Sequence, residues 1–345
     1  MPCPHQTSRY MKKLRVPHTD LSVSCIAYGC ANLAAWNTNS LGGEDKRRAA
    51  QLIHTALEQG ITLFDHADLY AFGKAETLFG EVLKASPALR QKIVLQSKCG
   101  QVFSPDFQWG KPIYVDLTRQ HIETSVEGSL KRLGTDYLDI LLLHAPSTLI
   151  KPDEVAAAFD QLHRDGKVRY FGVSNYGPSQ IQLLKTSVGQ PIVANQIHLG
   201  LGCPQAFVDG TEFTVELAQG GGGSGCRSAT TAGVLDYCRI EDIQIQAWSP
   251  VRGDLLSLRA DPAPELEALV HKLAGMAKSK QTTPAALALA WLLHHPAGIV
   301  PITGSGTPEH ISENCTADRI TLTGAEWYGL LAAAVELKTL AGGRY

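Results

Sequence analysis

The 345-residue sequence lacks several features that mark particular classes of protein. No segment approaches the roughly 20 apolar residues of a membrane-spanning helix, and residues 1–9 lack the apolar core of a secretory signal. Charged residues make up 19% of the chain and the formal net charge is −2, which does not favour nucleic acid or an anionic membrane as a partner. The eight cysteines contain no Cys-x-x-Cys pair. We therefore expect a reduced, cytoplasmic protein without a metal site.

Short β-rich runs alternate with segments of helical period along the chain. Apolar residues recur at spacings of three and four from Ala49 to Leu57, after a basic run, 46–48, that we interpret as a solvated helix face. Near-continuous apolar runs such as 138–143 indicate strands that are buried on both faces. Eight alternations predict an α/β fold, a closed (β/α)8 TIM barrel. The expected strands are 26–29, 62–65, 93–97, 138–144, 169–173, 192–196, 243–248 and 299–302.

We expect additions to this barrel at both ends and one long loop. Residues 1–12 are expected to form a flexible extension, and 13–345 a single barrel domain that begins with a β-hairpin. One or two extra C-terminal helices are expected, at 264–278 and after the capping box Thr323-x-x-Glu326. Residues 201–232 are expected to form a long flexible loop. Because this loop contains the glycine-rich run 220–225, an active-site lid or a phosphate site stays open as an alternative.

Four polar side chains stand at or near the ends of three successive predicted strands. Asp65, Lys98 and His144 end the second, third and fourth strands, and Tyr70 follows Asp65 closely. Because the strand ends of such a barrel converge on one pocket, we predict that these four residues form a catalytic group. The Lys98 charge is expected to lower the pKa of Tyr70 from about 10 toward neutrality, which suits a general acid. Together these groups would stabilise the alkoxide that forms when hydride attacks a carbonyl.

The run 60–70, Gly-Ile-Thr-Leu-Phe-Asp-His-Ala-Asp-Leu-Tyr, resembles the signature of the aldo-keto reductases around their catalytic aspartate and tyrosine. Lys98 and His144 match the two remaining catalytic positions, and the resemblance extends from about Leu14 to Leu337. The details are most similar to a bacterial-type branch of general oxidoreductases. The resemblance implies an NAD(P)H-dependent enzyme that reduces aldehydes or ketones to alcohols, with Tyr70 as the proton donor and a small carbonyl compound as substrate.

The resemblance also implies where the nicotinamide cofactor binds. Ser174, Asn175 and Gln196 match the residues that hold the nicotinamide carboxamide. Trp248 stands where an aromatic ring stacks on the nicotinamide, in a position that is commonly tyrosine, and it is followed by Ser249 and Pro250. The segment 300–314 resembles the one that binds the adenosine end. The residues assigned to that end are Ser305, Thr307, His310, Glu313 and Asn314.

The sequence departs from the family pattern at this adenosine segment. Members that clamp the 2′-phosphate of NADP generally place Lys or Arg here, whereas this chain has Gly304, Gly306 and His310. His310 would supply only a weak, pH-dependent charge. The resemblance favours NADP(H) over NAD(H) and leaves dual use open.

The substrate pocket is harder to locate from the sequence. Asn32 and Trp36 follow the first strand and Trp109 follows the third, so these residues could form an apolar wall for a carbonyl substrate. The alternative that such aromatic residues pack the loops themselves stays open.

Other classes of function also stay open. A Schiff-base lyase would use Lys98 as its nucleophile. A metal-dependent barrel hydrolase would use the cluster Asp65, His66, Asp68 and His144. A redox-sensing subunit would bind the cofactor with little turnover. For every class we expect a monomer or a weak homo-oligomer.

Overall fold

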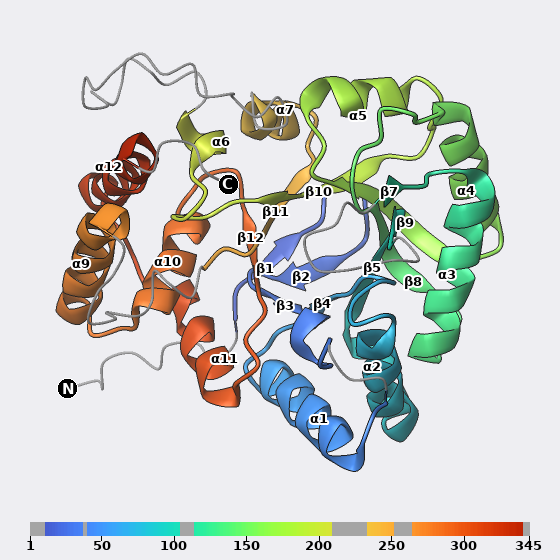
Figure 1. Cartoon of the computed structure of the whole chain (residues 1–345), viewed down its shortest axis with the longest axis horizontal. Coiled ribbons are helices and arrows are strands. Elements are labelled where there is room, and N and C mark those ends of the chain that lie inside the picture. The colour runs from blue at the N-terminus through green and yellow to red at the C-terminus, as the bar shows by residue number, and fades with distance from the viewer. Residues whose placement is uncertain (1–10, 37–39, 104–113, 209–232, 252–263, 341–345) are drawn as a thin grey trace, which may run out of the picture.

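The computed structural model describes residues 11–36, 40–103, 114–208, 233–251 and 264–340. Within these ranges eight parallel strands close into a barrel in the order β10-β11-β12-β3-β4-β5-β8-β9 (Figure 1). Each of the eight predicted strands is present, so the predicted TIM barrel is confirmed. The barrel strands are β3 (Ala27–Gly29), β4 (Leu63–Asp65), β5 (Val94–Cys99), β8 (Leu138–Leu143), β9 (Val168–Ser174), β10 (Ile192–His198), β11 (Gln244–Trp248) and β12 (Val300–Thr303).

Helices surround the barrel because each has one apolar face that packs against the strands. α4 is typical: Pro152 occupies its first turn, and Val155, Phe159 and Leu162 form its buried face. None of the helices within the described ranges is long and apolar enough to cross a membrane. The helices around the barrel are α1 (Gly43–Glu58), α2 (Lys74–Ala85), α3 (Arg119–Leu133), α4 (Pro152–Arg164), α5 (Pro178–Lys185), α6 (Gln205–Val208), α7 (Val234–Ile240), α10 (Pro284–Leu293) and α11 (Pro308–Asn314).

A short antiparallel hairpin closes the amino-terminal end of the barrel. It is formed by β1 (Lys13–Arg15) and β2 (Ser22–Ser24). Val16, Leu21 and Val23 of this hairpin pack in one apolar cluster with inward side chains of the barrel strands. The predicted N-terminal hairpin is therefore confirmed. The hairpin does not cover the carboxyl ends of the barrel strands, where the polar side chains lie. Smaller elements are the two-stranded sheet β6 (Gln101–Val102) with β7 (Tyr114–Val115), and the 3₁₀ turns η1 (Cys30–Asn32), η2 (Pro87–Lys92) and η3 (Cys315–Arg319).

Two further helices, α9 (Pro264–Ser279) and α12 (Gly324–Leu340), pack together beside α10 at one side of the barrel (Figure 1). The predicted capping box is present, since Glu326 accepts from the Thr323 backbone N–H and Thr323 Oγ1 accepts from that of Glu326. The stacked rings of Trp291 and Trp327, 5.0 Å apart, exchange indole hydrogen bonds with each other's backbone carbonyls. These contacts fasten α12 to α10, and both predicted C-terminal helices are confirmed.

Two parts of the predicted organisation lie outside the described residues. These are the extension up to residue 10 and most of the predicted long loop, including its glycine-rich run 220–225.

α2 and α3 approach each other so closely at Gly80 that an added Cβ would lie 2.2 Å from the carbonyl oxygen of Arg132. Gly80→Ala is therefore expected to lower the free energy of unfolding by about 1–3 kcal/mol, as overpacking does. Gly275→Ala in α9 is the matched control, because nothing lies within 4 Å of its added Cβ. This control should be neutral or more stable by about 0.5–1 kcal/mol. Urea denaturation measures both, and equal effects of the two substitutions would contradict the close approach.

Candidate active site

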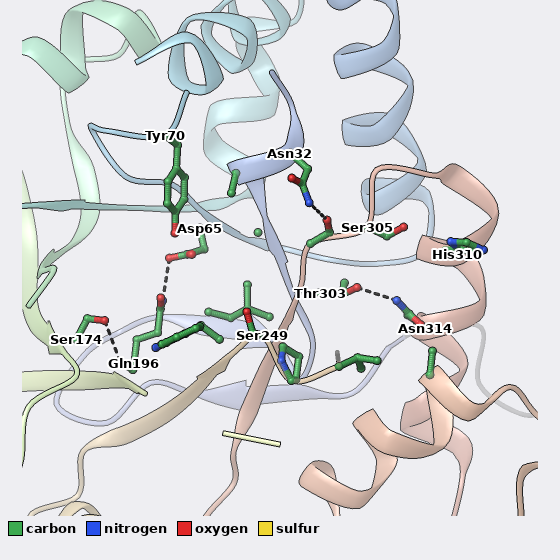
Figure 2. A pocket seen from close by; sticks show the side chains of 18 of the residues that line it. Asn32, Asp65, Tyr70, Ser174, Gln196, Ser249, Thr303, Ser305, His310 and Asn314 are labelled. Carbon is green, nitrogen blue, oxygen red and sulfur yellow. Dashed lines mark hydrogen bonds between the residues drawn. The ribbon is translucent and has the colours of Figure 1, made fainter. Parts of the chain in front are cut away.

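A cavity of about 980 Å³ opens at the carboxyl ends of the barrel strands. Its volume lies at the upper end of the range of small-molecule sites. Figure 2 shows Tyr70 and Asp65 toward one end and His310 and Asn314 toward the other. The strands contribute Gly29, Asp65, Ser174, Gln196, Trp248, Ile302 and Thr303 to its lining.

Asp65 and Lys98 form a buried ion pair at the floor of this cavity. Lys98 Nζ lies 2.7 Å from both carboxylate oxygens of Asp65 and donates to the carbonyl oxygen of His66 at 2.8 Å. The two side chains are only 3% and 1% exposed. Burial alone would lower the pKa of Lys98, but the charge of Asp65 and the neighbouring Tyr70 outweigh it and raise the pKa. Lys98 is therefore an ammonium ion with all three donors in use.

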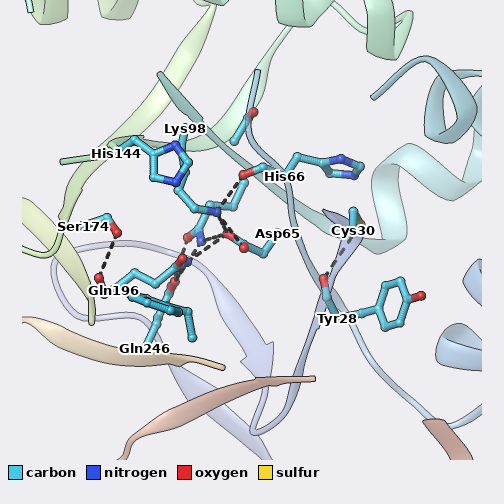
Figure 3. A network of polar contacts seen from close by, with 12 residues as sticks. Tyr28, Cys30, Asp65, His66, Lys98, His144, Ser174, Gln196 and Gln246 are labelled. Atoms are coloured by element: carbon cyan, nitrogen blue, oxygen red, sulfur yellow. Dashed lines mark hydrogen bonds and ion pairs between the residues drawn. The ribbon is translucent and has the colours of Figure 1, made fainter. Parts of the chain in front are cut away.

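A network of glutamine amides holds the Asp65 carboxylate inside the barrel, and Figure 3 shows Gln196 and Gln246 in this network. The side-chain amides of Gln96 and Gln196 donate to Asp65 Oδ1 at 2.6 and 2.9 Å. Both also donate to Gln246 Oε1, at 2.8 and 3.1 Å, and Gln246 Nε2 donates back to Gln96 Oε1 at 3.0 Å. A buried carboxylate is costly unless it is paired and hydrogen-bonded, and this network meets that requirement.

Tyr70 lies above this floor, on the loop between β4 and α2. The loop turns tightly, with Ala71 and Phe72 in the left-handed region at φ 49° and 59°, so the surrounding packing must fix it. The Tyr70 ring centroid is 5.0 Å from Lys98 Nζ. Burial raises the pKa of Tyr70 and outweighs the lowering effect of the Lys98 charge. The expectation of a lowered pKa is therefore wrong, and the phenol keeps its proton.

His144 follows β8 and lines the cavity next to Tyr70, with ring centroids 6.1 Å apart and planes nearly perpendicular. Burial and the positive charge of Lys98 hold the pKa of His144 well below its usual value. The imidazole is therefore neutral and offers one donor and one acceptor. Its buried Nδ1 has no hydrogen-bond partner among the residues that the structure describes. A neutral donor thus stands beside the tyrosine hydroxyl group.

The wall formed by the ends of β9 and β10 holds Ser174, Asn175 and Gln196. The Ser174 hydroxyl group donates to the backbone oxygen of Gln196 at 2.9 Å. Asn175, in the left-handed region at φ 63°, donates to Ser174 Oγ at 3.1 Å and to the backbone oxygen of His144 at 3.2 Å. The structure thus links this wall to the strand end that carries His144.

Trp248, at the end of β11, is held on two sides. Its indole N–H donates to Asn175 Oδ1 at 2.8 Å, and its ring stacks on His198 with centroids 4.1 Å apart. Ser249, at φ 47°, and Pro250 continue the cavity wall beyond it. The ring is therefore fixed in place as part of the cavity lining.

The far end of the cavity lies between β12 and α11. His310, Glu313 and Asn314 line it, and Asn314 Nδ2 donates to Thr303 Oγ1 at 2.8 Å. Asn314 Oδ1 is buried, and no hydrogen-bond partner for it is present within the described ranges. A buried acceptor without a partner suits a donor on a bound molecule.

Two side chains of the first strand and its turn hold the loop after β12. Asn32 Nδ2 donates to the backbone oxygen of Gly304 at 2.7 Å, and the Tyr28 hydroxyl group donates to that of Ser305 at 2.9 Å. Asn32 and Ser305 line the cavity, whereas Thr307 lies beyond the lining at the start of α11. Asn32, predicted as part of the substrate pocket, therefore lines the cavity beside the segment for which adenosine binding is predicted.

Trp36 belongs to an aromatic group beside Tyr70. Its ring packs edge-on against Tyr70, Phe72 and Phe103, with centroid distances of 6.5, 6.1 and 6.4 Å. Phe72 and Phe103 contact each other at 5.0 Å. Phe72 was not predicted from the sequence because it precedes the helical pattern of α2. Trp109, the third predicted residue of this pocket, lies outside the described residues.

A second set of buried polar side chains, also not predicted, lies behind the strand ends. Glu76 accepts from Ser97 Oγ and from Arg132 Nε, both at 2.7 Å. Partial burial and the nearby Glu76 carboxylate raise the pKa of the half-buried Asp68 to about 7. The signal in the sequence was a glutamate placed among the apolar residues of α2, which indicates a buried partner.

The cluster that suggested a metal site is engaged in other contacts. Asp65 is paired with Lys98, and the His66 ring packs edge-on against Phe79 with centroids 4.7 Å apart. Among the described residues, no group of three or more His, Cys, Asp or Glu side chains could hold a metal ion.

Comparison with known proteins agrees with this geometry. The model of the aldo/keto reductase family matches residues 26–332. The uncharacterized oxidoreductase YcsN of Bacillus subtilis is 34% identical over 91% of this chain and 95% of that protein. A 6-dehydroglucose reductase of Agrobacterium fabrum is 33% identical over the same shares of the two chains. An aldo-keto reductase from Klebsiella pneumoniae, solved in complex with NADPH, has a TM-score of 0.69 and 25% identity over 93% of this chain and 94% of that chain.

The chain therefore belongs to the aldo/keto reductase family, whose members are NAD(P)H-dependent oxidoreductases that act on carbonyl compounds. The prediction of an enzyme of this family is confirmed, and the three similar proteins named above are bacterial, as expected.

The raised pKa of Asp68 makes stability depend on pH. Because the folded-state pKa is about 7 against 3.8 for an ordinary aspartate, the folded chain holds a proton that the unfolded chain releases. Stability at this site is therefore greatest below about pH 4 and falls as pH rises to 7, by about 2–4 kcal/mol. Asp68→Asn should remove most of this slope in urea denaturation between pH 4.5 and 8. The exposed Asp236→Asn is the control, and parallel curves for all three proteins would contradict the assignment.

Proposed function

We propose that this chain reduces aldehydes or ketones to alcohols, with NADPH preferred over NADH and Tyr70 as the general acid. The observation that carries the proposal is the convergence of Tyr70, His144 and the Asp65–Lys98 pair at one end of the cavity. Such a group can protonate an oxygen and stabilise negative charge within a site shielded from water.

Each of these side chains has a distinct part in the proposed reaction. Tyr70 keeps its proton until the product oxygen takes it, since burial raises the pKa of the phenol. The ammonium group of Lys98 stabilises the negative charge that then develops on the tyrosine oxygen. Neutral His144 donates a hydrogen bond to the carbonyl oxygen of the substrate and orients it. When bound, the reduced nicotinamide supplies the hydride for the carbonyl carbon.

The lining of the cavity fits a nicotinamide dinucleotide. At one end, Trp248 offers a fixed aromatic face, and Ser174, Asn175 and Gln196 offer polar groups for a carboxamide. At the other end, the unpartnered oxygen of Asn314 suits the amino group of an adenine. We assign the rest of the cofactor's surroundings to Ser249, Pro250, Ser305, Thr307, His310 and Glu313.

The aromatic group beside Tyr70 favours an uncharged substrate. Trp36, Phe72 and Phe103 present apolar rings next to the proposed proton donor. Apolar rings beside the proton donor suit the carbon skeleton of an aldehyde or ketone without a fixed charge, and the sequence assigns Trp109 to the same substrate pocket.

Two alternatives are separated from this proposal by specific tests. A Schiff-base lyase needs a neutral lysine, whereas the raised pKa of Lys98 keeps it protonated. Borohydride treatment in the presence of substrate would trap a covalent adduct only in the lyase. A redox-sensing subunit would bind the cofactor and show almost no turnover of simple aldehydes.

Tyr70→Phe removes only the proposed proton donor. We expect kcat for aldehyde reduction to fall at least about 100-fold, which is the scale of general acid catalysis. Cofactor affinity, measured by quenching of tryptophan fluorescence, should stay within about twofold because the ring is retained. The exposed Tyr328→Phe serves as the control. Wild-type turnover in the Tyr70 variant would remove this residue from the mechanism.

Lys98→Met leaves the Asp65 carboxylate buried without its counter-ion. We expect a loss of activity similar to that of Tyr70→Phe and a loss of stability of about 3–5 kcal/mol. Adding Asp65→Asn should restore most of the stability and none of the activity, because the amide needs no counter-ion and Tyr70 still lacks its cation. Activity that returns together with stability would show that Lys98 is only structural. Thermal unfolding and steady-state kinetics give the two readouts.

A further inference from the structure

Among the residues that the structure describes, no lysine or arginine lines the far end of the cavity. The segment 303–314 contains no lysine or arginine, and none of the residues that line the cavity is a lysine or an arginine. His310 and Glu313 line this end, so a titratable imidazole and a carboxylate stand on the same wall. Within the described ranges, a cation for an anion bound here would therefore come from an element that does not line the cavity.

Arg48 is such a cation, and it comes from α1. This helix packs beside α11 (Figure 1), and Arg48 Nη2 lies 2.9 Å from the position that a Cβ on Gly306 would take. The guanidinium group thus lies against the loop after β12 because residue 306 has no side chain. That loop carries Ser305, which lines the far end of the cavity (Figure 2).

The guanidinium group is held in place without being neutralised. Arg48 donates to the backbone oxygen of Asn32 at 3.1 Å and to that of Leu33 at 3.5 Å. Within the ranges that the structure describes, no carboxylate forms an ion pair with Arg48, whereas the neighbouring Lys46 pairs with Glu81. The basic run that the sequence presented as a solvated helix face therefore contains one arginine whose guanidinium group lies against the loop after β12.

We propose that Arg48 binds the 2′-phosphate of NADP(H) and gives the chain its preference for NADPH over NADH. This inference rests on the proposed function, which sets the adenosine end of the cofactor at Asn314. The two cofactors differ there by one phosphate group, which carries close to two negative charges at neutral pH. A guanidinium group with free N–H donors is the side chain best suited to a phosphate, and its fork is already oriented by two backbone carbonyls.

The opposite preference has its own candidate residue. A carboxylate that accepts from the ribose 2′-hydroxyl group favours NAD, and Glu313 stands on the same wall. In that case, removing the charge of Arg48 would change the affinities for NADPH and for NADH by the same factor.

The test is a fluorescence titration of the intact protein with NADPH and with NADH, together with competition by adenosine 2′,5′-bisphosphate and by 5′-AMP. We expect the wild type to prefer NADPH and the bisphosphate. Arg48→Met should raise the Kd of NADPH about 10- to 100-fold, as loss of charged hydrogen bonds does, and leave that of NADH within about twofold. Arg48→Lys should give an intermediate loss, since it keeps the charge and loses the fork. Arg47→Met, which removes an adjacent exposed charge, should change neither value.

Three results would overturn this inference. If Arg48→Met raised the Kd of NADPH and that of NADH equally, the role of Arg48 would be limited to holding the backbone at Asn32. Equal affinities in the wild type, or a preference for NADH, would assign the site to Glu313. A wild type that binds neither cofactor would instead overturn the proposed function, so the two failures are distinguishable.

Discussion

The buried pairing of Lys98 with Asp65 is the interaction on which the rest of the site depends. Two charges in an apolar barrel are costly to desolvate, and they become tolerable only when every lone pair and donor is satisfied. Here the partners come from strands that are far apart in the sequence: β4 and β5 supply the ions, and β10 and β11 supply amides that surround them. The complete site therefore exists only in the closed barrel. Gln246 on β11 is connected to the carboxylate through its hydrogen bonds with Gln96 and Gln196.

Much of the fold could be predicted from the sequence because the signals were local. The alternation of apolar runs with helical periods identified all eight barrel strands, and the capping box at Thr323 identified the last helix. The predicted strand ends also located Asp65, Lys98 and His144 at the same end of the barrel, because the carboxyl ends of all strands in a parallel barrel lie together. Contacts between distant residues were not predictable in this way. Gln96 and Gln246 are ordinary strand residues in the sequence, and only the three-dimensional closure makes them neighbours.

The prediction of a lowered pKa for Tyr70 was wrong for a physical reason. A sequence reveals the charges that will be near a residue and says little about how completely the residue will be buried. The expected effect of Lys98 is present, but burial acts in the opposite direction and is larger. Arg48 gives the converse case. The basic run on the helix surface was interpreted as a solvated face, whereas the structure places the Arg48 guanidinium group against Gly306 in the loop after β12. In both cases the deciding quantity was packing, which residue type alone does not specify.

The glutamine network has a consequence for what the floor of the cavity can recognise. Both N–H groups of the Gln196 amide are used inside the barrel, by Asp65 and by Gln246. The orientation of this amide is therefore set from behind, and the group that it can offer to the cavity is an oxygen. If the Gln246 side-chain amide rotated by 180°, its hydrogen bond to Gln96 Oε1 would be lost. The donor and acceptor positions of this network are therefore fixed. At this position the cavity therefore presents a hydrogen-bond acceptor, which favours a bound group that carries an N–H.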